Sequence, residues 1–258
     1  MEKTELGQTG IKVSRLGLGT VKFGRNEGVK YPKGFELPDE KHLAALLAQA
    51  KELGINLLDT APAYGLSEER LGRLLTGQRK DWVIVSKAGE EFENGVSRYD
   101  FSAKHFEMSL ERTLKRLQTD YVDALLIHSD GEIEQDLDDI AGVLQDFKKR
   151  GLAKAVGSST KTIEGGLKAA EIFDVVMVTP DQTEVLDKAG QLNKGVLLKK
   201  ILGSGHETDI QKAMRAAFVH KAVSAAIVGT ITPAHLLQNV EALQKVFSSP
   251  SRLSSSGL

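Results

Sequence analysis

Eight short apolar segments recur along this chain of 258 residues, and segments with a helical pattern alternate with them. The apolar segments are residues 15–20, 56–59, 82–87, 124–128, 153–159, 175–178, 195–200 and 225–230. Strands that are apolar on both faces and separated by helices pair in parallel and lie buried. Their number and the chain length fit one (β/α)8 TIM barrel better than a doubly wound sheet, which usually has fewer strands. The sequence therefore predicts the α/β class, with one barrel domain over residues 1–258.

The helical segments begin at polar residues or proline, and two of them end at glycines. Asp39 can cap a helix in which leucines recur at helical spacing until Gly54 ends it. The expected helices run from Asp39 to Gly54, from Ser67 as a cap to Leu75, from Ser102 to Leu117, from 137 to 151, from about 162 to 172, and from Pro233 onward.

The remaining segments are mostly polar. Residues 3–13 predict a β-hairpin around a turn at residues 7–10. Residues 21–38 and residues 88–102 contain Gly and polar side chains and are expected to be loops. Residues 248–258 are rich in Ser, and we expect them to form a mobile tail.

The composition excludes several classes of protein. The net charge is -1, so the chain has no basic surplus for nucleic acid or for an anionic membrane. The chain has no cysteine, which excludes disulfides, thiolate metal sites and a cysteine nucleophile. Its first residues are polar, and no apolar run approaches the ~20 residues of a membrane span. We therefore expect a soluble cytoplasmic protein with no nucleic-acid or membrane partner.

Three consecutive predicted strands end in a side chain that can take part in chemistry. Asp59 ends the second strand, Lys87 the third and His128 the fourth, and Tyr64 follows Asp59 on the next loop. The carboxyl ends of barrel strands meet at one rim, and neighbouring strands lie about 5 Å apart. We therefore expect these four side chains to lie together.

The four side chains can together protonate a carbonyl oxygen. The Asp59 carboxylate would keep Lys87 charged, and that charge would lower the pKa of Tyr64 from about 10 toward that of a working general acid. A neutral His128 would donate a hydrogen bond that orients the carbonyl oxygen toward the Tyr64 hydroxyl. Each residue alone also has a structural interpretation. Asp59 could form a turn, and Lys87 could pair with a neighbouring carboxylate. His128 could be a satisfied structural donor, and Tyr64 could cover the barrel mouth. Their placement at one rim favours a shared site.

Several motifs, in order along the chain, resemble those of the aldo-keto reductases. They are Leu6-Gly-Gln-Thr-Gly-Ile-Lys-Val-Ser14 with Leu16-Gly-Leu-Gly-Thr20, Asp59-Thr-Ala-Pro-Ala-Tyr-Gly-Leu-Ser-Glu68, Val85-Ser-Lys87 and Asp120-Tyr-Val-Asp-Ala-Leu-Leu-Ile-His128. The resemblance runs over essentially the whole chain, and the motifs are specific when they occur together. It implies a barrel closed at its bottom by the N-terminal hairpin. It also implies that Asp59, Tyr64, Lys87 and His128 are the catalytic tetrad, with Tyr64 as the general acid.

The resemblance further implies an oxidoreductase that reduces aldehyde or ketone carbonyls to alcohols by hydride transfer from NADPH. The cofactor would lie extended across the barrel mouth without a Rossmann domain, and no G-x-G-x-x-G turn follows the first strand. The resemblance favours NADP(H). NAD(H) stays open because Gly229 and His235 stand where many relatives carry a cation and an arginine. No metal ligands are expected.

The expected cofactor contacts are Gly19, Thr20, Asp59, Ser159, Thr160, Met177, Lys199, Lys200, Leu202, Gly203, Gly229, Thr230, His235 and Asn239. The segment from Gly229 leads into a helix whose free N–H groups and dipole favour phosphate, and His235 and Asn239 lie one turn apart on it. By resemblance, Ser159 and Thr160 contact the nicotinamide amide. Met177 replaces a glutamine of relatives, and Lys199 replaces a tyrosine that stacks on the nicotinamide. Lys199 and Lys200 could present positive charge to the pyrophosphate. Alternatively, one of the two is solvated at the rim and the other forms an ion pair.

Two other functions are compatible with parts of this pattern. A nicotinamide-binding regulatory or sensor subunit would bind the cofactor with little turnover. A metal-dependent barrel hydrolase would use His128 and Asp59. The segment 21–23 and the loop after Lys87 are expected to line the substrate pocket, but the sequence names neither the carbonyl substrate nor the oligomeric state.

Overall fold

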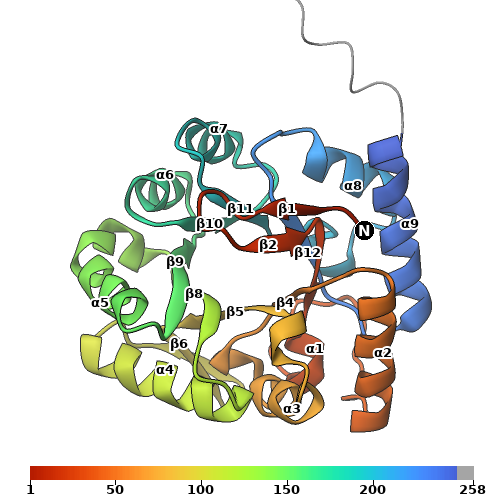
Figure 1. Ribbon diagram of the computed structural model, residues 1–258, viewed down its shortest axis with the longest axis horizontal. Helices are drawn as coiled ribbons and strands as arrows, with labels where there is room; N and C mark the ends of the chain where they lie inside the picture. Colours follow the sequence, from red (N-terminus) through yellow and green to blue (C-terminus); the bar gives the residue numbers. More distant parts are fainter. Residues whose placement is uncertain (249–258) are drawn as a thin grey trace, which may run out of the picture.

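Eight parallel strands close into a barrel in the computed structural model, which describes residues 1–248 (Figure 1). They are β3 (Leu16–Gly19), β4 (Leu57–Asp59), β5 (Val83–Ala88), β8 (Val122–His128), β9 (Ala153–Ser159), β10 (Val175–Val178), β11 (Gly195–Leu198) and β12 (Ala225–Val228). They follow one another in chain order around the barrel, and β12 pairs with β3 to close it. The predicted barrel and its eight strands are confirmed. The expected tail, beyond Ser248, lies outside the described residues.

Helices surround the strands (Figure 1). They are α1 (Val21–Gly24), α2 (Glu40–Glu52), α3 (Ser67–Leu74), α4 (Ala103–Leu117), α5 (Leu137–Lys149), α6 (Ile163–Ile172), α7 (Thr183–Gln191), α8 (Ile210–Phe218) and α9 (Pro233–Ser248). As predicted, the side chain of Asp39 caps α2. The side chain of Ser102 caps α4. Within residues 1–248, no helix combines the length and the apolar character that crossing a membrane requires.

Three expectations about the helical segments were incomplete or wrong. Ser67 is the first residue of α3 and not its cap: its hydroxyl donates to Thr20 Oγ1 at 2.7 Å, and no side chain among the described residues accepts from the first N–H groups of the helix. Helix α1 interrupts the predicted loop 21–38. Helices α7 and α8 were not predicted, although each buries an apolar face, with Val185, Leu186 and Ala189 in α7 and Ala213, Met214, Ala217 and Phe218 in α8.

Alternate residues of the strands point into the barrel, as the period of two requires. The inward-pointing residues in the body of the strands form an apolar interior. The next inward-pointing residue, at the carboxyl end of the strand, is polar. The pairs are Leu57 and Asp59 in β4, Val85 and Lys87 in β5, Leu126 and His128 in β8, and Leu197 and Lys199 at the end of β11. The pattern that builds the core therefore also aims these polar groups into the mouth.

The N-terminal hairpin closes the bottom of the barrel, as expected. Strands β1 (Lys3–Glu5) and β2 (Lys12–Ser14) pair antiparallel across one end of the barrel (Figure 1). Leu6, Ile11 and Val13 belong to the same apolar cluster as the barrel interior. The buried Asn56 joins the hairpin to the start of β4, because its Oδ1 accepts from Ser14 N at 2.7 Å and its Nδ2 donates to Lys12 O at 2.9 Å.

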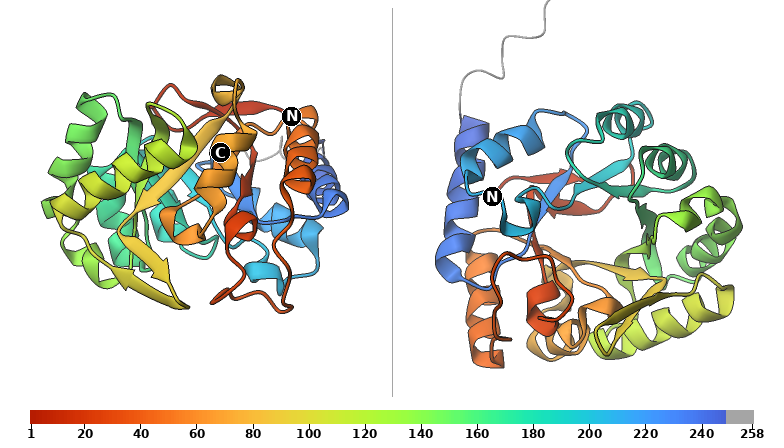
Figure 2. Two further views of the ribbon diagram at one scale, coloured as in Figure 1. Left: turned by 90° about the horizontal axis from the view of Figure 1, so that it is seen from below. Right: turned by 180° about the vertical axis from the view of Figure 1, so that it is seen from behind.

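A second hairpin lies at the opposite end, where a polar loop was expected. Strands β6 (Glu90–Glu93) and β7 (Val96–Tyr99) pair antiparallel and turn at Asn94 and Gly95, both with positive φ. Figure 2 (left) shows this hairpin and the loop 25–38 at one end of the molecule and the N-terminal hairpin at the other. Asn-Gly is a strong signal for a two-residue hairpin turn, so the sequence did contain the information.

We expect Asn56→Ala to lower the free energy of unfolding by about 1–3 kcal/mol, because it leaves Ser14 N and Lys12 O without their partner. Urea unfolding followed by circular dichroism measures this loss. Gln8→Ala, at an exposed position of the same hairpin, is the control and should change little. Equal effects of the two substitutions would contradict a role for Asn56 as the clamp.

Candidate active site

Lys87 is the centre of a group of side chains at the carboxyl end of the barrel. The residue is 1% exposed. Its Nζ donates to Asp59 Oδ1 at 2.5 Å, to Thr60 O at 3.0 Å and to Tyr64 Oη at 3.0 Å. Each proton of the ammonium thus has an acceptor. Because the Tyr64 oxygen accepts from Lys87, its own proton is free to be donated elsewhere.

The turn after β4 brings Tyr64 to Lys87. Residues Pro62–Tyr64 form one 3-10 turn, and Gly65 follows with φ 60°. A Cβ on Gly65 would lie 2.3 Å from Gly24 O, so only glycine allows the turn to pack against α1. The short spacing from Asp59 to Tyr64 therefore returns the phenol ring to the strand end it has just left.

The electrostatics of this group differ in part from the expectation. Burial opposes the charged form of Lys87, but the charge and hydrogen bond of Asp59 outweigh it and raise the pKa of Lys87. Burial and the Asp59 charge raise the pKa of Tyr64 to about 12, although Lys87 opposes the rise. The predicted lowering of the Tyr64 pKa is therefore wrong in its net direction, because burial outweighs the lysine charge. At neutral pH the Tyr64 hydroxyl keeps its proton and is a donor.

His128 joins the group through a residue that the sequence analysis missed. Its ring lies edge-on to the Tyr64 ring, with centroids 6.1 Å apart. Its Nδ1 lies 2.8 Å from Oε2 of Glu90, the first residue of β6. Burial, partly opposed by Glu90, lowers the pKa of His128. Burial alone would raise the pKa of Glu90, but His128, Ser97 and Arg25 hold it at about 2. The Asn-Gly turn of the hairpin was the available signal for Glu90.

The expected contacts of the nicotinamide amide are partly used within the protein. Lys199 Nζ donates to Ser159 Oγ at 2.9 Å and to Thr160 O at 2.6 Å, reaching from the end of β11 past β10 to β9. Burial and nearby positive charges lower the pKa of Lys199 to about 7. Met177 belongs to the apolar barrel interior. Thr20 donates through both N and Oγ1 to Asp59 O, each at 2.9 Å, beside Gly19.

The residues after β11 fit the phosphates of a dinucleotide. Partial burial and the charges of Lys30 and Lys161 lower the pKa of Lys200. A bound phosphate would relieve this repulsion. Leu202 and Gly203 continue the same segment into a short turn at Gly203–Gly205.

The segment after β12 fits an adenosine moiety in part. The amide oxygen of Asn239 is buried and has no hydrogen-bond partner among the described residues, so it can accept from a ligand amine. His235, one turn earlier on α9, is exposed. A Cβ on Gly229 would lie 2.9 Å from the Tyr31 hydroxyl, so a side chain beside Thr230 would displace that hydroxyl.

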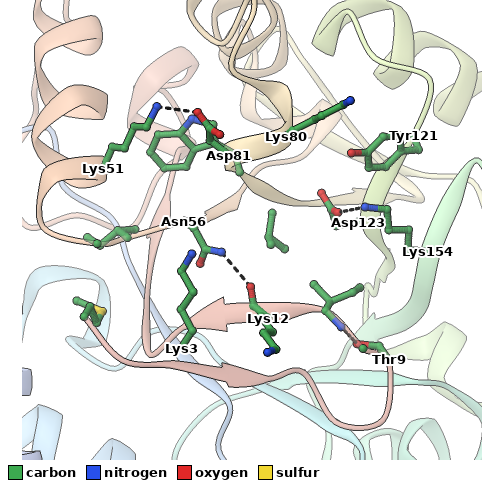
Figure 3. A pocket seen from close by; sticks show the side chains of 17 residues that line it. Lys3, Thr9, Lys12, Lys51, Asn56, Lys80, Asp81, Tyr121, Asp123 and Lys154 are labelled. Atoms are coloured by element: carbon green, nitrogen blue, oxygen red, sulfur yellow. Dashed lines mark hydrogen bonds and ion pairs between the residues drawn. The ribbon is translucent and has the colours of Figure 1, made fainter.

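A cavity of about 630 Å³ lies away from this group, beside the N-terminal hairpin (Figure 3). Lysines from several segments line it, and two of them are paired, Lys51 with Asp81 and Lys154 with Asp123. None of Asp59, Tyr64, Lys87 and His128 lines it, so it is separate from the group around Lys87. In residues 1–248, no three His, Asp or Glu side chains come close enough to bind a metal ion.

Comparison with known proteins places this geometry among related structures. The profile of the Aldo/keto reductase family matches residues 15–194. A solved structure from Pseudomonas aeruginosa, described as an aldo-keto reductase, is 47% identical, covers 95% of both chains and superposes with a TM-score of 0.88. An aldo-keto reductase of Bacillus halodurans, at 24% identity and a TM-score of 0.79 over 95% of this chain and 91% of its own, supports the fold alone.

A curated relative adds a dehydrogenase. L-galactose dehydrogenase of Arabidopsis thaliana is 35% identical over 164 residues, which are 61% of this chain and 48% of that protein. The chain spans about half the length of the curated relatives that it matches.

We expect Lys199→Met to raise the free energy of unfolding more at about pH 6 than at about pH 9.5, because the unfolded chain holds this proton up to about pH 10.4. The folded chain loses the proton near pH 7, since its pKa is lowered. Between these values the unfolded chain binds more protons, so this lysine makes stability rise with pH. The variant loses that contribution.

Urea unfolding at the two pH values measures the difference. Lys41→Met, at an exposed position on α2, is the control and should show no such dependence on pH. A pH-independent effect of Lys199→Met would refute a shifted lysine at the barrel mouth.

Proposed function

Because the chain belongs to the aldo/keto reductase family, we propose that it reduces the carbonyl group of small aldehydes or ketones to an alcohol with NADPH. The observation that supports this most directly is the Tyr64 hydroxyl held by the buried Lys87 ammonium at 3.0 Å. A carbonyl oxygen beside Tyr64 would meet a protonated phenol whose position is determined by the lysine.

The side chains divide the work of the reaction. The nicotinamide, when bound, supplies the hydride to the carbonyl carbon. Tyr64 gives its proton to the carbonyl oxygen, and the Lys87 ammonium stabilises the tyrosinate that remains. Asp59 keeps Lys87 charged and in place through the 2.5 Å contact. The product alcohol leaves, and a proton from solvent restores the phenol.

The choice of NADPH over NADH rests on the charges and polar groups around the mouth. Lys200, with Lys30 and Lys161 nearby, favours a ligand rich in phosphate. His235 and the orphaned amide oxygen of Asn239 lie on α9, where the adenosine end would bind. Asp59 pairs with Lys87, and His128 pairs with Glu90. These separate partners favour carbonyl reduction over a metal ion shared by Asp59 and His128.

We expect Tyr64→Phe to reduce carbonyl turnover by about 10²–10⁴-fold, because proton transfer by a positioned acid contributes that much. Cofactor affinity should stay within a few-fold of the wild type. NADPH oxidation with a panel of aldehydes and ketones measures the rate, and the change in NADPH emission on titration with the protein measures binding.

Tyr121→Phe, away from the mouth beside the 630 Å³ cavity, is the matched control and should turn over normally. Tight cofactor binding with negligible turnover in the wild type would instead support the regulatory-subunit alternative. Equal activity in Tyr64→Phe and wild type would exclude Tyr64 as the proton donor.

A further inference from the structure

The two ring nitrogens of His128 have different surroundings. Nδ1 is shielded from solvent and lies 2.8 Å from Glu90 Oε2. Nε2 makes no hydrogen bond with the described residues and is not among the shielded atoms, so it is the nitrogen that is accessible at the barrel mouth. A reacting oxygen beside Tyr64 would therefore meet Nε2.

A proton must lie between Nδ1 and Glu90. Two lone pairs facing each other at 2.8 Å would repel, so either the ring or the carboxyl group carries a hydrogen there. The contact is bent relative to the ideal N–H direction, but at 2.8 Å the two atoms are still too close for both to be unprotonated. The location of the proton then depends on which of the two groups holds it more tightly.

The surroundings of Glu90 stabilise its charged form. Ser97 Oγ donates to Glu90 Oε1 at 2.6 Å, and Arg25 Nη1 lies 3.8 Å from the same oxygen. Arg25 also donates to Ala63 O at 3.1 Å, which ties the carboxylate to the turn that carries Tyr64. Glu90 is 8% exposed. An ionised, anchored carboxylate leaves the proton on Nδ1.

We infer that Glu90 is a positioning residue that holds the proton of His128 on Nδ1. Nε2 of the neutral ring is then a hydrogen-bond acceptor toward the mouth, and it becomes a donor only when the ring takes up a second proton. The catalytic meaning of this inference rests on the proposed function. The neutral, donating His128 expected from the sequence is replaced by a ring that donates to substrate only in its charged form.

Charged groups on several elements decide when His128 takes up that proton. Glu90 on β6 favours the imidazolium, whereas burial and the charges of Lys87 on β5 and Lys199 on β11 disfavour it. Burial and the two lysines outweigh Glu90, so the pKa of His128 lies below its ordinary value. Tyr64 is protonated and neutral in this range. Near neutral pH, the unprotonated Nε2 can therefore accept a hydrogen bond from the hydroxyl of an alcohol. At lower pH, the protonated Nε2 can donate a hydrogen bond to a carbonyl oxygen.

The state of the His128 ring can be measured without turnover. We expect ¹⁵N and ¹³C NMR of labelled wild-type protein to show neutral His128 in the Nδ1–H form, with the signal assigned by its loss in His128→Gln. In Glu90→Gln we expect the pKa of His128 to fall by about one unit or more, because an opposite charge has been removed. The Nε2–H form should also appear, since a glutamine amide can donate to Nδ1.

Glu91→Gln is the matched control, because Glu91 follows Glu90 on β6 but pairs with Arg112 and His105. It should leave the His128 signals unchanged. A neutral wild-type ring in the Nε2–H form overturns the inference, and so do unchanged signals in Glu90→Gln. The wild-type spectrum decides even if the variant folds poorly.

Kinetics test the consequence separately. In the wild type, kcat/KM for carbonyl reduction should rise as pH falls through the pKa of His128. In Glu90→Gln this rise in kcat/KM should occur at a pH about one unit lower. At a given pH above the pKa of His128, kcat/KM should then be about tenfold lower than in the wild type. The NMR result holds whether or not the protein turns over carbonyls. The expected ring state with no turnover would therefore overturn the proposed function alone, whereas an unmoved pH profile in an active Glu90→Gln enzyme would overturn the inference.

Discussion

The buried ammonium of Lys87 is the constraint on which the barrel mouth depends. Leaving such a charge without its partner costs about 3–5 kcal/mol, so its three acceptors must stay in place. Asp59 and Thr60 supply two of them from the end of β4, and Tyr64 supplies the third from the turn that follows. The contacts that stabilise the buried charge therefore also determine where the phenol hydroxyl lies. The same hydrogen bonds stabilise the fold and position Tyr64.

The two hairpins have different roles at opposite ends of the barrel (Figure 2). The N-terminal hairpin closes the bottom with apolar side chains and the Asn56 clamp, which concerns stability. The β6–β7 hairpin at the top carries Glu90 to His128 and, through Arg25, is tied to the turn of Tyr64. This division follows the general rule that barrels place stability at the N-terminal face and chemistry at the C-terminal face.

Lys199 and Met177 shape the part of the mouth where we propose that the nicotinamide binds. Lys199 occupies the hydrogen-bonding groups of Ser159 and Thr160, while Met177 belongs to the interior core. A lysine buried among other positive charges is less basic than usual, so it can shed its proton near neutral pH. Positive charge at this rim thus varies with pH and with what binds there.

The sequence by itself determined the barrel, its strand ends and the placement of Asp59, Lys87 and His128 at one rim. These follow from apolar runs, the period of two and the parallel pairing that intervening helices impose. Helices α7 and α8 were overlooked although each has a buried apolar face, and so was the hairpin that carries Glu90, despite its Asn-Gly turn. Only the tertiary structure decided the balance of charges. The pKa of Tyr64 rises although Lys87 is adjacent, and His128 faces Glu90, because burial and long-range contacts depend on packing that no local pattern encodes.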